Sequence, residues 1–562
     1  MIELPPFFIF FVGAGLVAAT RGPLRTIFLL AVPIFSALSL NGIPEGSHFT
    51  VALFDYELQL LRVDKLSLLF GYLFHLAALI AVIYSLHVRD TVQHVSGLLY
   101  AGSALGAVFA GDLITLFLAW EALALSSVFL ILARRTPSAQ AAAMRYLAVQ
   151  VISGLILLAG VLVRLNDLGS PAFTFIGLDS AGGFLIFTAF GIKCAFPLLH
   201  NWLTDAYPEA TPTGAIFLSA FTTKVAVYAL ARGFPGTEVL VYIGAAMTIF
   251  PIFYAFIEND LRRVLAYSMI NQLGFMVVGI GLGTAMAING AVGHAFNDVV
   301  FKGLLFMSMG AVLSQTGKIN ASDLGGLYKS MPITTVFCIV GALSISAVPF
   351  FSGFVSKSMV MVAALDEGYP IVWLALLFSS ASVFHYVGIK IPFFAFFAHD
   401  SGIRATDPSF NMLFAMGMAA LICIFNGAWP WLLYSMLPFP MTYEPYTTTH
   451  VLAQSQLLLF SALAFVWLRL SGFQPPELKG VNIDADWIFR KPLNWIATTT
   501  LRVGSRWNGV AQNAVASYLG YLGRLVFRYS GPQGVFARTL ESGSAALWVA
   551  IILAASLLLY YL

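Results

Sequence analysis

Five ionisable side chains lie inside segments of this sequence that are apolar enough to span a lipid bilayer: Glu121, Lys193, Lys224, Lys302 and Lys357. A charge at the bilayer centre costs at least about 2.5 to 3.5 kcal/mol on insertion scales, so an ionisable residue at that depth indicates a proton or ion pathway. A single such residue could be explained by helix packing alone. Four lysines and one carboxylate in one chain indicate a relay that passes protons or ions along the membrane interior.

The elements that position these residues follow from an apolar composition. Of 562 residues, 59% are hydrophobic and 10% are charged, whereas soluble domains carry about 25% charged residues. The chain is therefore read as an integral membrane protein. Its three cysteines form no CxxC pair, which argues against an iron–sulfur cluster or cysteine-bound zinc, and no phosphate loop is found. We expect no cofactor and no metal site.

Apolar stretches of roughly 18 to 25 residues recur along the chain, the length that a membrane-crossing helix needs. They predict an all-α fold of about 16 spans, near residues 5–20, 24–40, 65–86, 93–110, 112–133, 139–163, 183–200, 213–232, 237–256, 263–282, 287–314, 333–363, 370–397, 410–435, 451–470 and 545–562. Residues 46–63 alternate loosely and predict a small extramembrane hairpin. The N-terminal stretch is not expected to be a cleaved signal, because Glu3 stands where a basic region should be.

Glu121 is the only ionisable side chain between Asp112 and Arg134. A lone carboxylate there should be protonated or paired with a cation from a neighbouring helix. The alternative is an inert ion pair that only holds helices together.

Lys193 lies one turn before Pro197. Proline removes a backbone donor and clashes with the carbonyl four residues earlier, so we expect the helix to open beside the lysine. A second interruption is predicted where Pro349 and Gly353 precede Lys357. Two broken, lysine-bearing helices about 160 residues apart indicate two related halves, as in many transporters; the alternative is two unrelated kinks.

His294, Asp298 and Lys302 recur every four residues and therefore share one helix face over roughly 12 Å. Three titratable groups on one stripe can pass a proton in steps, provided that water fills the gaps. The alternative is a static ion pair between Asp298 and Lys302. Lys224 is alone in its helix, so its partner must come from another helix.

The loop charges predict an orientation. With the N-terminus outside, the cytoplasmic loops hold most of the basic loop residues, namely Arg21, Arg25, Arg89, Arg134, Arg135, Arg262, Arg263, Lys318, Lys329 and Arg404, while the opposite loops hold acidic residues such as Glu45, Asp55 and Asp366. Residues 471–544 are basic and aromatic. They predict interfacial amphipathic helices on the membrane surface or, as the alternative, a docking arm for a neighbouring subunit.

Several of these segments resemble a known family. FLAWEALALSS, KCAFPLLHNWLTDAYPEATPTGA, NDLRRVLAYSMINQLGF, HAFNDVVFKGLLF and VPFFSGFVSKS are similar to motifs of the antiporter-like membrane subunits of respiratory complex I, Mrp cation/proton antiporters and membrane-bound hydrogenases. The resemblance covers roughly residues 50–430. Asp298 departs from it, standing where the family has a second histidine, and the later broken helix has Val-Pro-Phe in place of a double proline. The combination of Lys224 with Lys357 is most similar to the MrpD type of Mrp antiporter subunit.

The resemblance implies two inverted five-helix repeats with broken helices. We place them at residues 91–235 and 236–400, after N-terminal helices and a hairpin (1–90) and before C-terminal helices (401–470), a basic segment (471–544) and a final span (545–562). It also implies a proton relay in which Glu121 and Lys193 form the input switch. Lys224, His294 and Lys302 form the bridge, and Lys357 gates the exit.

Three functions follow as alternatives. The favoured one is a proton-translocating subunit of a Na⁺/H⁺ antiporter in the inner (cytoplasmic) membrane, partnered by other membrane subunits. The second is a proton-pumping subunit of an NADH:quinone oxidoreductase or hydrogenase, and the third is an ion-coupled scaffold for another uptake partner. None of them makes this chain a redox catalyst, and none involves nucleic acid.

Overall fold

The structure is a computed structural model that describes residues 5–53, 56–473, 477–480, 482–537 and 542–561. Glu3 and Asp55, used above, and Arg538 of the basic segment lie outside these ranges. The chain divides into two compact units, Met1–Asn482 and Ile483–Leu562.

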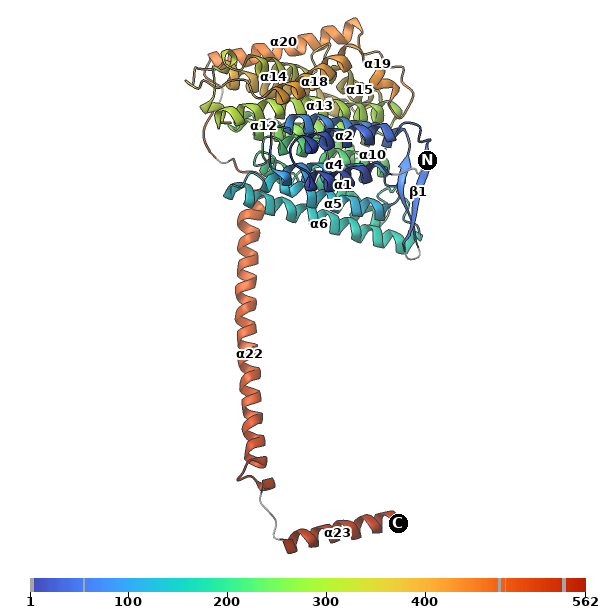
Figure 1. The fold of residues 1–562 in the computed structure, drawn as a ribbon, viewed down its shortest axis with the longest axis vertical. Coiled ribbons are helices and arrows are strands. Elements are labelled where there is room, and N and C mark those ends of the chain that lie inside the picture. The colour runs from blue at the N-terminus through green and yellow to red at the C-terminus, as the bar shows by residue number, and fades with distance from the viewer. Residues whose placement is uncertain (1–4, 54–55, 474–476, 481, 538–541, 562) are drawn as a thin grey trace. The chain divides into compact units, whose positions relative to one another are not determined.

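The first unit is a bundle of membrane-length helices, confirming the predicted all-α membrane fold. In Figure 1 its helices lie side by side with roughly parallel axes. In order, they are α1 (Pro6–Ala19), α2 (Pro23–Ser39), α3 (Lys65–Ser85), α4 (Thr91–Phe109), α5 (Leu113–Leu132), α6 (Pro137–Leu168), α7 (Ala181–Lys193), α8 (Asn201–Ala206), α9 (Gly214–Ala220), α10 (Thr222–Gly233), α11 (Val239–Ile257), α12 (Leu261–Leu282), α13 (Ala285–Thr316), α14 (Pro332–Ile345), α15 (Ser352–Asp366), α16 (Pro370–Val383), α17 (Lys390–Pro392), α18 (Phe410–Ala428), α19 (Trp431–Ser435) and α20 (Thr448–Leu470). Across the described part of both units, eleven helices are long and apolar enough to cross a membrane, and four shorter apolar helices add to them.

Helix ends follow local sequence signals. Asp64 begins α3 with a capping box, in which its side chain accepts from Ser67 N and the Ser67 hydroxyl accepts from Asp64 N. Asp112 and Asp260 likewise accept backbone hydrogen bonds at the starts of α5 and α12. The predicted hairpin is present as strands β1 (Gly46–Leu53) and β2 (Tyr56–Val63), which pair antiparallel.

The first unit contains an internal repeat, α4–α10 and then α11–α17. Each half has a short antiparallel bridge before its second helix, Asp112 with Ala172 and Asp260 with Asn320. In each half the fourth membrane crossing is a broken helix, α7 with α8 in the first half and α14 with α15 in the second. Because five crossings are an odd number, the second half starts on the opposite side of the membrane and is inverted.

Five predicted spans are not regular single helices, and one of them, residues 213–232, divides into α9 and α10 at Phe221. Residues 183–200 and 333–363 contain the two predicted breaks, and residues 410–435 divide into α18 and α19 at Trp429–Pro430. Residues 370–397 form one continuous helical segment, but two stretches of it, Phe384–Ile389 and Phe393–Phe397, are π-helical. Hydrophobic periodicity does not distinguish these forms, because the residues stay apolar through each irregularity.

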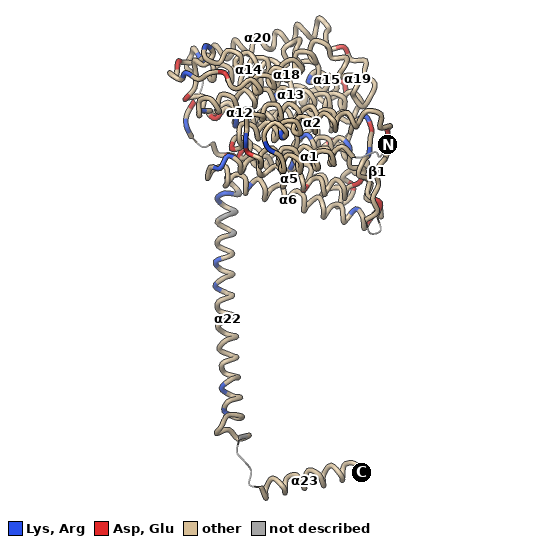
Figure 2. Tube along the Cα trace, viewed as in Figure 1, with Lys and Arg blue, Asp and Glu red and all other residues tan. Residues whose placement is uncertain are grey.

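Most charged residues of the bundle lie toward the two ends of its helices (Figure 2). One end holds Arg89, Arg134, Arg135, Arg262 and Arg263, and we call it the arginine-rich face. Contacts between its loops show that they share one side: Arg135 pairs with Asp90 at 3.3 Å, and both Arg134 and Arg262 donate to carbonyls in the loop between α8 and α9.

The second unit contains α22 (Asn494–Ser530) and α23 (Ser542–Tyr561). Four arginines are spaced along α22 (Figure 2), and the helix has no acidic residue. Its apolar residues gather on one side, which is the amphipathic pattern predicted for this segment.

Candidate functional site

The first broken helix positions Lys193. Helix α7 ends at this lysine, and the chain then turns through Ala195 and Leu198, whose φ angles are +61° and +68°. Non-glycine residues rarely adopt positive φ, so the break is held by its surroundings. Part of that support comes from Trp202, whose Nε1 donates to Ile192 O at 2.8 Å and satisfies a carbonyl at the open helix end.

The second broken helix repeats this geometry. Helix α14 ends at Ile345, and the positive φ angles fall at Ala347 (+58°) and Phe350 (+72°), the same three-residue spacing. Lys357 from α15 reaches back and donates to Ile345 O at 2.6 Å, with its Nζ 5.2 Å from the centre of the Phe275 ring. A cation at a helix C-terminus is favoured by the helix dipole, so this break holds a buried lysine at its open end.

Glu121 and Lys193 are not ion-paired. In the described structure no Glu121 oxygen lies within 4.0 Å of the Lys193 ammonium. Lys193 donates instead to Trp120 O at 2.7 Å and lies 4.3 Å from the centre of the Trp120 ring. Glu121 packs against Gly154 of α6, and its Oε1 is buried with no hydrogen-bond partner among the described residues. The two predicted members of the switch are therefore neighbours in an open arrangement.

Lys224 finds its partner on another helix, as predicted. Its Nζ lies 2.6 Å from Asp298 Oδ2, and both side chains are 0% exposed. The alternative of an Asp298–Lys302 ion pair is wrong, because Lys302 donates to Ser268 Oγ at 2.5 Å. Asp298, which departs from the family pattern, thus links the first repeat to the second.

His294 joins α13 to two further helices. Its Nδ1 lies 3.0 Å from Ser356 Oγ of α15, and its Nε2 lies 3.2 Å from Gln272 Oε1 of α12. With Nε2 donating to the amide oxygen, Nδ1 accepts from the serine hydroxyl. Ser356 lies one residue before Lys357, so the stripe on α13 leads to the second broken helix.

Several polar residues of the site were not singled out from the sequence. Gln272 donates to Asn271 Oδ1 at 2.7 Å, and Asn271 donates to Ser379 Oγ at 2.7 Å. Asn297 of α13 donates to Ser352 O at 2.8 Å, at the start of α15. The adjacent Asn-Gln pair inside an apolar span was an available signal, because buried amides need partners.

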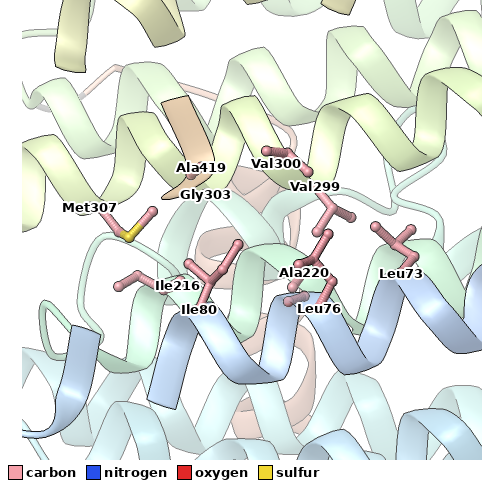
Figure 3. Close-up of a pocket in the computed structure, with 11 residues that line it drawn as sticks. Leu73, Leu76, Ile80, Ile216, Ala220, Val299, Val300, Gly303, Met307 and Ala419 are labelled. Carbon is pink, nitrogen blue, oxygen red and sulfur yellow. The ribbon is translucent and has the colours of Figure 1, made fainter. Parts of the chain in front are cut away.

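The opposite face of α13 is apolar. Figure 3 shows a small cavity between α3, α9, α13 and α18, into which Val299, Val300, Gly303 and Met307 of α13 face. Its volume is about 20 Å³. Apolar cavities of this size stay dry, so this side of α13 offers no water to a proton.

The buried lysines, the histidine, the carboxylates and their hydroxyl partners are groups that can donate and accept protons. In the described ranges, no group of three or more His, Cys, Asp and Glu side chains is placed to bind a metal. The buried cations and hydroxyls suit stepwise proton transfer, in which each group donates one proton and accepts another.

Comparisons with known proteins agree with the fold and the motifs. The family described as NADH:quinone oxidoreductase/Mrp antiporter, TM matches residues 110–385. Hydrogenase-4 component B of Escherichia coli (strain K12) is 28% identical, covering 54% of this chain and 51% of that protein. Na(+)/H(+) antiporter subunit A1 of Staphylococcus aureus (strain JH9) is 29% identical, covering 68% of this chain and 54% of that protein. The chain spans about half the length of these curated relatives.

Solved structures share the fold. A chain of the Mrp complex from Dietzia sp. DQ12-45-1b matches with a TM-score of 0.77 at 24% identity, over 92% of this chain and 62% of that one. The membrane-bound sulfane sulfur reductase, an archaeal respiratory membrane complex, gives 0.71 at 22% identity, over 99% and 100%. Respiratory complex I from Thermus thermophilus gives 0.66 at 23% identity, over 77% and 98%.

Proposed function

We propose that this chain, whose residues 110–385 match the family described as NADH:quinone oxidoreductase/Mrp antiporter, TM, is an antiporter-like membrane subunit that translocates protons within a multisubunit membrane complex. The proton relay uses Glu121, Lys193, Lys224, His294, Asp298, Lys302 and Lys357. The observation that carries the proposal is the series of ionisable groups, each at most 1% exposed, that begins at Lys193 of one broken helix and ends at Lys357 of the other. Glu121, at the start of the relay, is half-buried.

Burial makes these groups suited to transport. An isolated charge in a low-dielectric interior is costly, so each lysine needs a partner such as the Trp120 carbonyl, Asp298, Ser268 or the Ile345 carbonyl. A partner that moves changes the stability of the charged lysine. The open arrangement of Glu121 and Lys193 fits a switch, since approach of the carboxylate stabilises the ammonium and its withdrawal favours release of the proton.

The work must come from outside the chain. Moving a unit charge across about 100 mV takes roughly 2.3 kcal/mol, and a counter-ion or a coupled reaction supplies it. We favour exchange against Na⁺ in an Mrp-type complex in the cytoplasmic membrane, with the arginine-rich face on the cytoplasmic side as loop charge indicates. The assignment to the MrpD type rests on Lys224 and Lys357, whereas the relatives named above are a subunit A1 and a hydrogenase component.

A respiratory or hydrogenase-type complex is the second candidate. The observation that favours it is the extent of the structural alignment. The matched chain of the archaeal membrane-bound sulfane sulfur reductase aligns with 99% of this chain and over its own full length. In either complex, we propose that α22 lies along a membrane surface, its arginines on anionic lipid.

Proton exchange in sealed vesicles that carry the native complex tests the function. Wild type is compared with Glu121→Gln and Lys357→Ala, with and without Na⁺, and the exposed loop variant Lys318→Ala is the matched control. We expect both buried-site variants to abolish Na⁺-dependent exchange while the complex still assembles, and the control to resemble wild type. Exchange that survives in both would make the buried charges structural and favour the scaffold alternative. Exchange that follows a redox reaction rather than Na⁺ would favour the second candidate.

A further inference from the structure

A second buried polar cluster lies at the arginine-rich end of α16 and α17, outside the relay described above. Lys390 is 1% exposed, and its Nζ donates to Phe256 O and to Glu258 O, each at 2.8 Å. These carbonyls end α11, so the lysine caps that helix. Its ammonium also lies 3.1 Å from Glu477 Oε1.

Glu477 belongs to a short stretch of chain that crosses this end of the bundle. The stretch comprises residues 477–480 and Asn482, and we call it the strap. Three contacts hold it to the bundle: Glu477 with Lys390, Lys479 with Asp323 at 2.7 Å, and Asn482 Nδ2 with Glu258 Oε2 at 3.0 Å. The Lys479 pair is exposed, while the Glu477 pair is buried.

The π-helical turn Phe384–Ile389 carries a histidine toward this cluster. His385 lies one π-turn before Lys390, interacts with it electrostatically, and is 5% exposed. Its Nε2 is buried without a hydrogen-bond partner in the described chain, and its ring contacts Phe256 and Phe465. Buried polar atoms without a protein partner commonly bind water, and π-helical turns often mark functional sites.

The next residue connects the cluster to the relay. Tyr386 is 0% exposed, and its hydroxyl lies near the side chain of Ser268 but, like His385 Nε2, is buried without a hydrogen-bond partner among the described residues. Ser268 accepts the hydrogen bond of Lys302. Two buried polar atoms without a protein partner, His385 Nε2 and the Tyr386 hydroxyl, therefore lie between the strap and the Lys302–Ser268 hydrogen bond, where bound water would bridge them.

We propose that Glu477, His385 and Tyr386 form an access route by which protons pass between the arginine-rich face and Lys302, with the Glu477–Lys390 ion pair as its gate. The route rests on the proposed proton relay and adds a connection to it. Glu477 takes a proton from water, which weakens its pairing with Lys390. The proton then passes through water to His385 Nε2, and the Tyr386 and Ser268 hydroxyls each donate one proton as they accept another, until Lys302 is protonated.

The surroundings of Glu477 suit a proton acceptor. Burial raises the pKa of Glu477 by more than the nearby Lys390 lowers it, so the side chain binds a proton at higher pH than an exposed glutamate does. The other charged groups near it are Arg469 of α20, which favours its charged form, and Glu258 after α11, which opposes it. Arg263 of α12 lies 3.9 Å from Glu258.

The test compares proton exchange in vesicles of the native complex for wild type, His385→Phe and Glu477→Gln, as a function of pH on the arginine-rich side. Lys479→Met is the matched control, because it removes the other strap ion pair without touching the route. We expect His385→Phe to slow exchange by about tenfold or more, as loss of a positioned proton carrier does. Glu477→Gln should remove the dependence on pH at that side, Glu477→Asp should restore it, and Lys479→Met should resemble wild type.

Two other outcomes are informative. If His385→Phe and Glu477→Gln exchange like wild type while Lys357→Ala is inactive, the access route is wrong and the relay stands. If Lys479→Met is as impaired as Glu477→Gln, the strap only tethers the bundle and the route is wrong. Wild-type exchange in Lys357→Ala as well would overturn the relay itself. Assembly of each variant complex, measured by size-exclusion chromatography, separates these results from misfolding.

Discussion

Replacing Asp298 with asparagine removes the counter-ion of Lys224 while keeping the size of the side chain. At a separation of 2.6 Å, two unit charges attract by about 6 kcal/mol at an effective dielectric constant near 20. Part of that attraction offsets the loss of hydration of two fully buried groups. Because an uncompensated buried charge remains, we expect Asp298→Asn to lower the free energy of unfolding by about 3 to 5 kcal/mol.

Thermal unfolding of the purified protein in detergent measures this effect. The matched control is Asp400→Asn, which breaks an ion pair of similar length, 2.8 Å, whose side chains are 65% and 61% exposed. Exposed pairs contribute about 0 to 1 kcal/mol, so the control should unfold near the wild-type temperature.

The double variant Lys224→Met, Asp298→Leu completes a cycle. It removes both charges, so it should recover most of the lost stability and still fail to exchange protons. If Asp298→Asn is as stable as wild type, or if the double variant is less stable than the single one, the buried Lys224 does not depend on Asp298 for its stability, and the reasoning is wrong.

Two more predictions concern packing and pH. A Cβ at position 154 would overlap Glu121 Oε1, so Gly154→Ala should displace the carboxylate and slow proton exchange by about tenfold. The control is Gly303→Ala, whose added Cβ meets no atom within 4 Å and should leave the exchange rate unchanged. Equal exchange rates for the two variants in vesicles would show that the position of Glu121 does not matter. Burial favours a raised pKa for Asp64, but Arg232 and hydrogen bonds from Ser67 N and Arg232 outweigh it and lower the pKa below 3.8. The wild-type protein should therefore unfold at a higher temperature than Asp64→Asn above about pH 4, and the difference should close as pH falls through the lowered pKa; a difference that grows in acid would contradict this.

The broken helices could be predicted from the sequence because their causes are local. A proline inside a helix removes a backbone hydrogen bond, and the structure places a break beside Pro197 and Pro349. Proline alone does not decide this, because α2 and α11 continue through Pro33 and Pro251. The stripe of His294, Asp298 and Lys302 was equally accessible, since helical periodicity alone puts residues four apart on one face.

The partners of these groups were beyond the sequence. Asp298 has a lysine four residues away on its own helix, yet it pairs with Lys224, 74 positions earlier in the chain. Lys390 was not singled out, although a lysine in the apolar segment IGIKIPFF was visible. Its burial depends on carbonyls at the end of α11 and on Glu477, which only folding brings together.

The sequence by itself therefore determined that this is a helical membrane protein, that two lysine-bearing helices break beside Pro197 and Pro349, and which ionisable residues lie in apolar spans. Length, apolarity and proline act over a few residues, so they can be read along the chain. The tertiary structure decided which charges pair, which helices the polar face of α13 contacts, and that Glu121 stands apart from Lys193. Those features depend on distances between helices, which the order of residues does not specify.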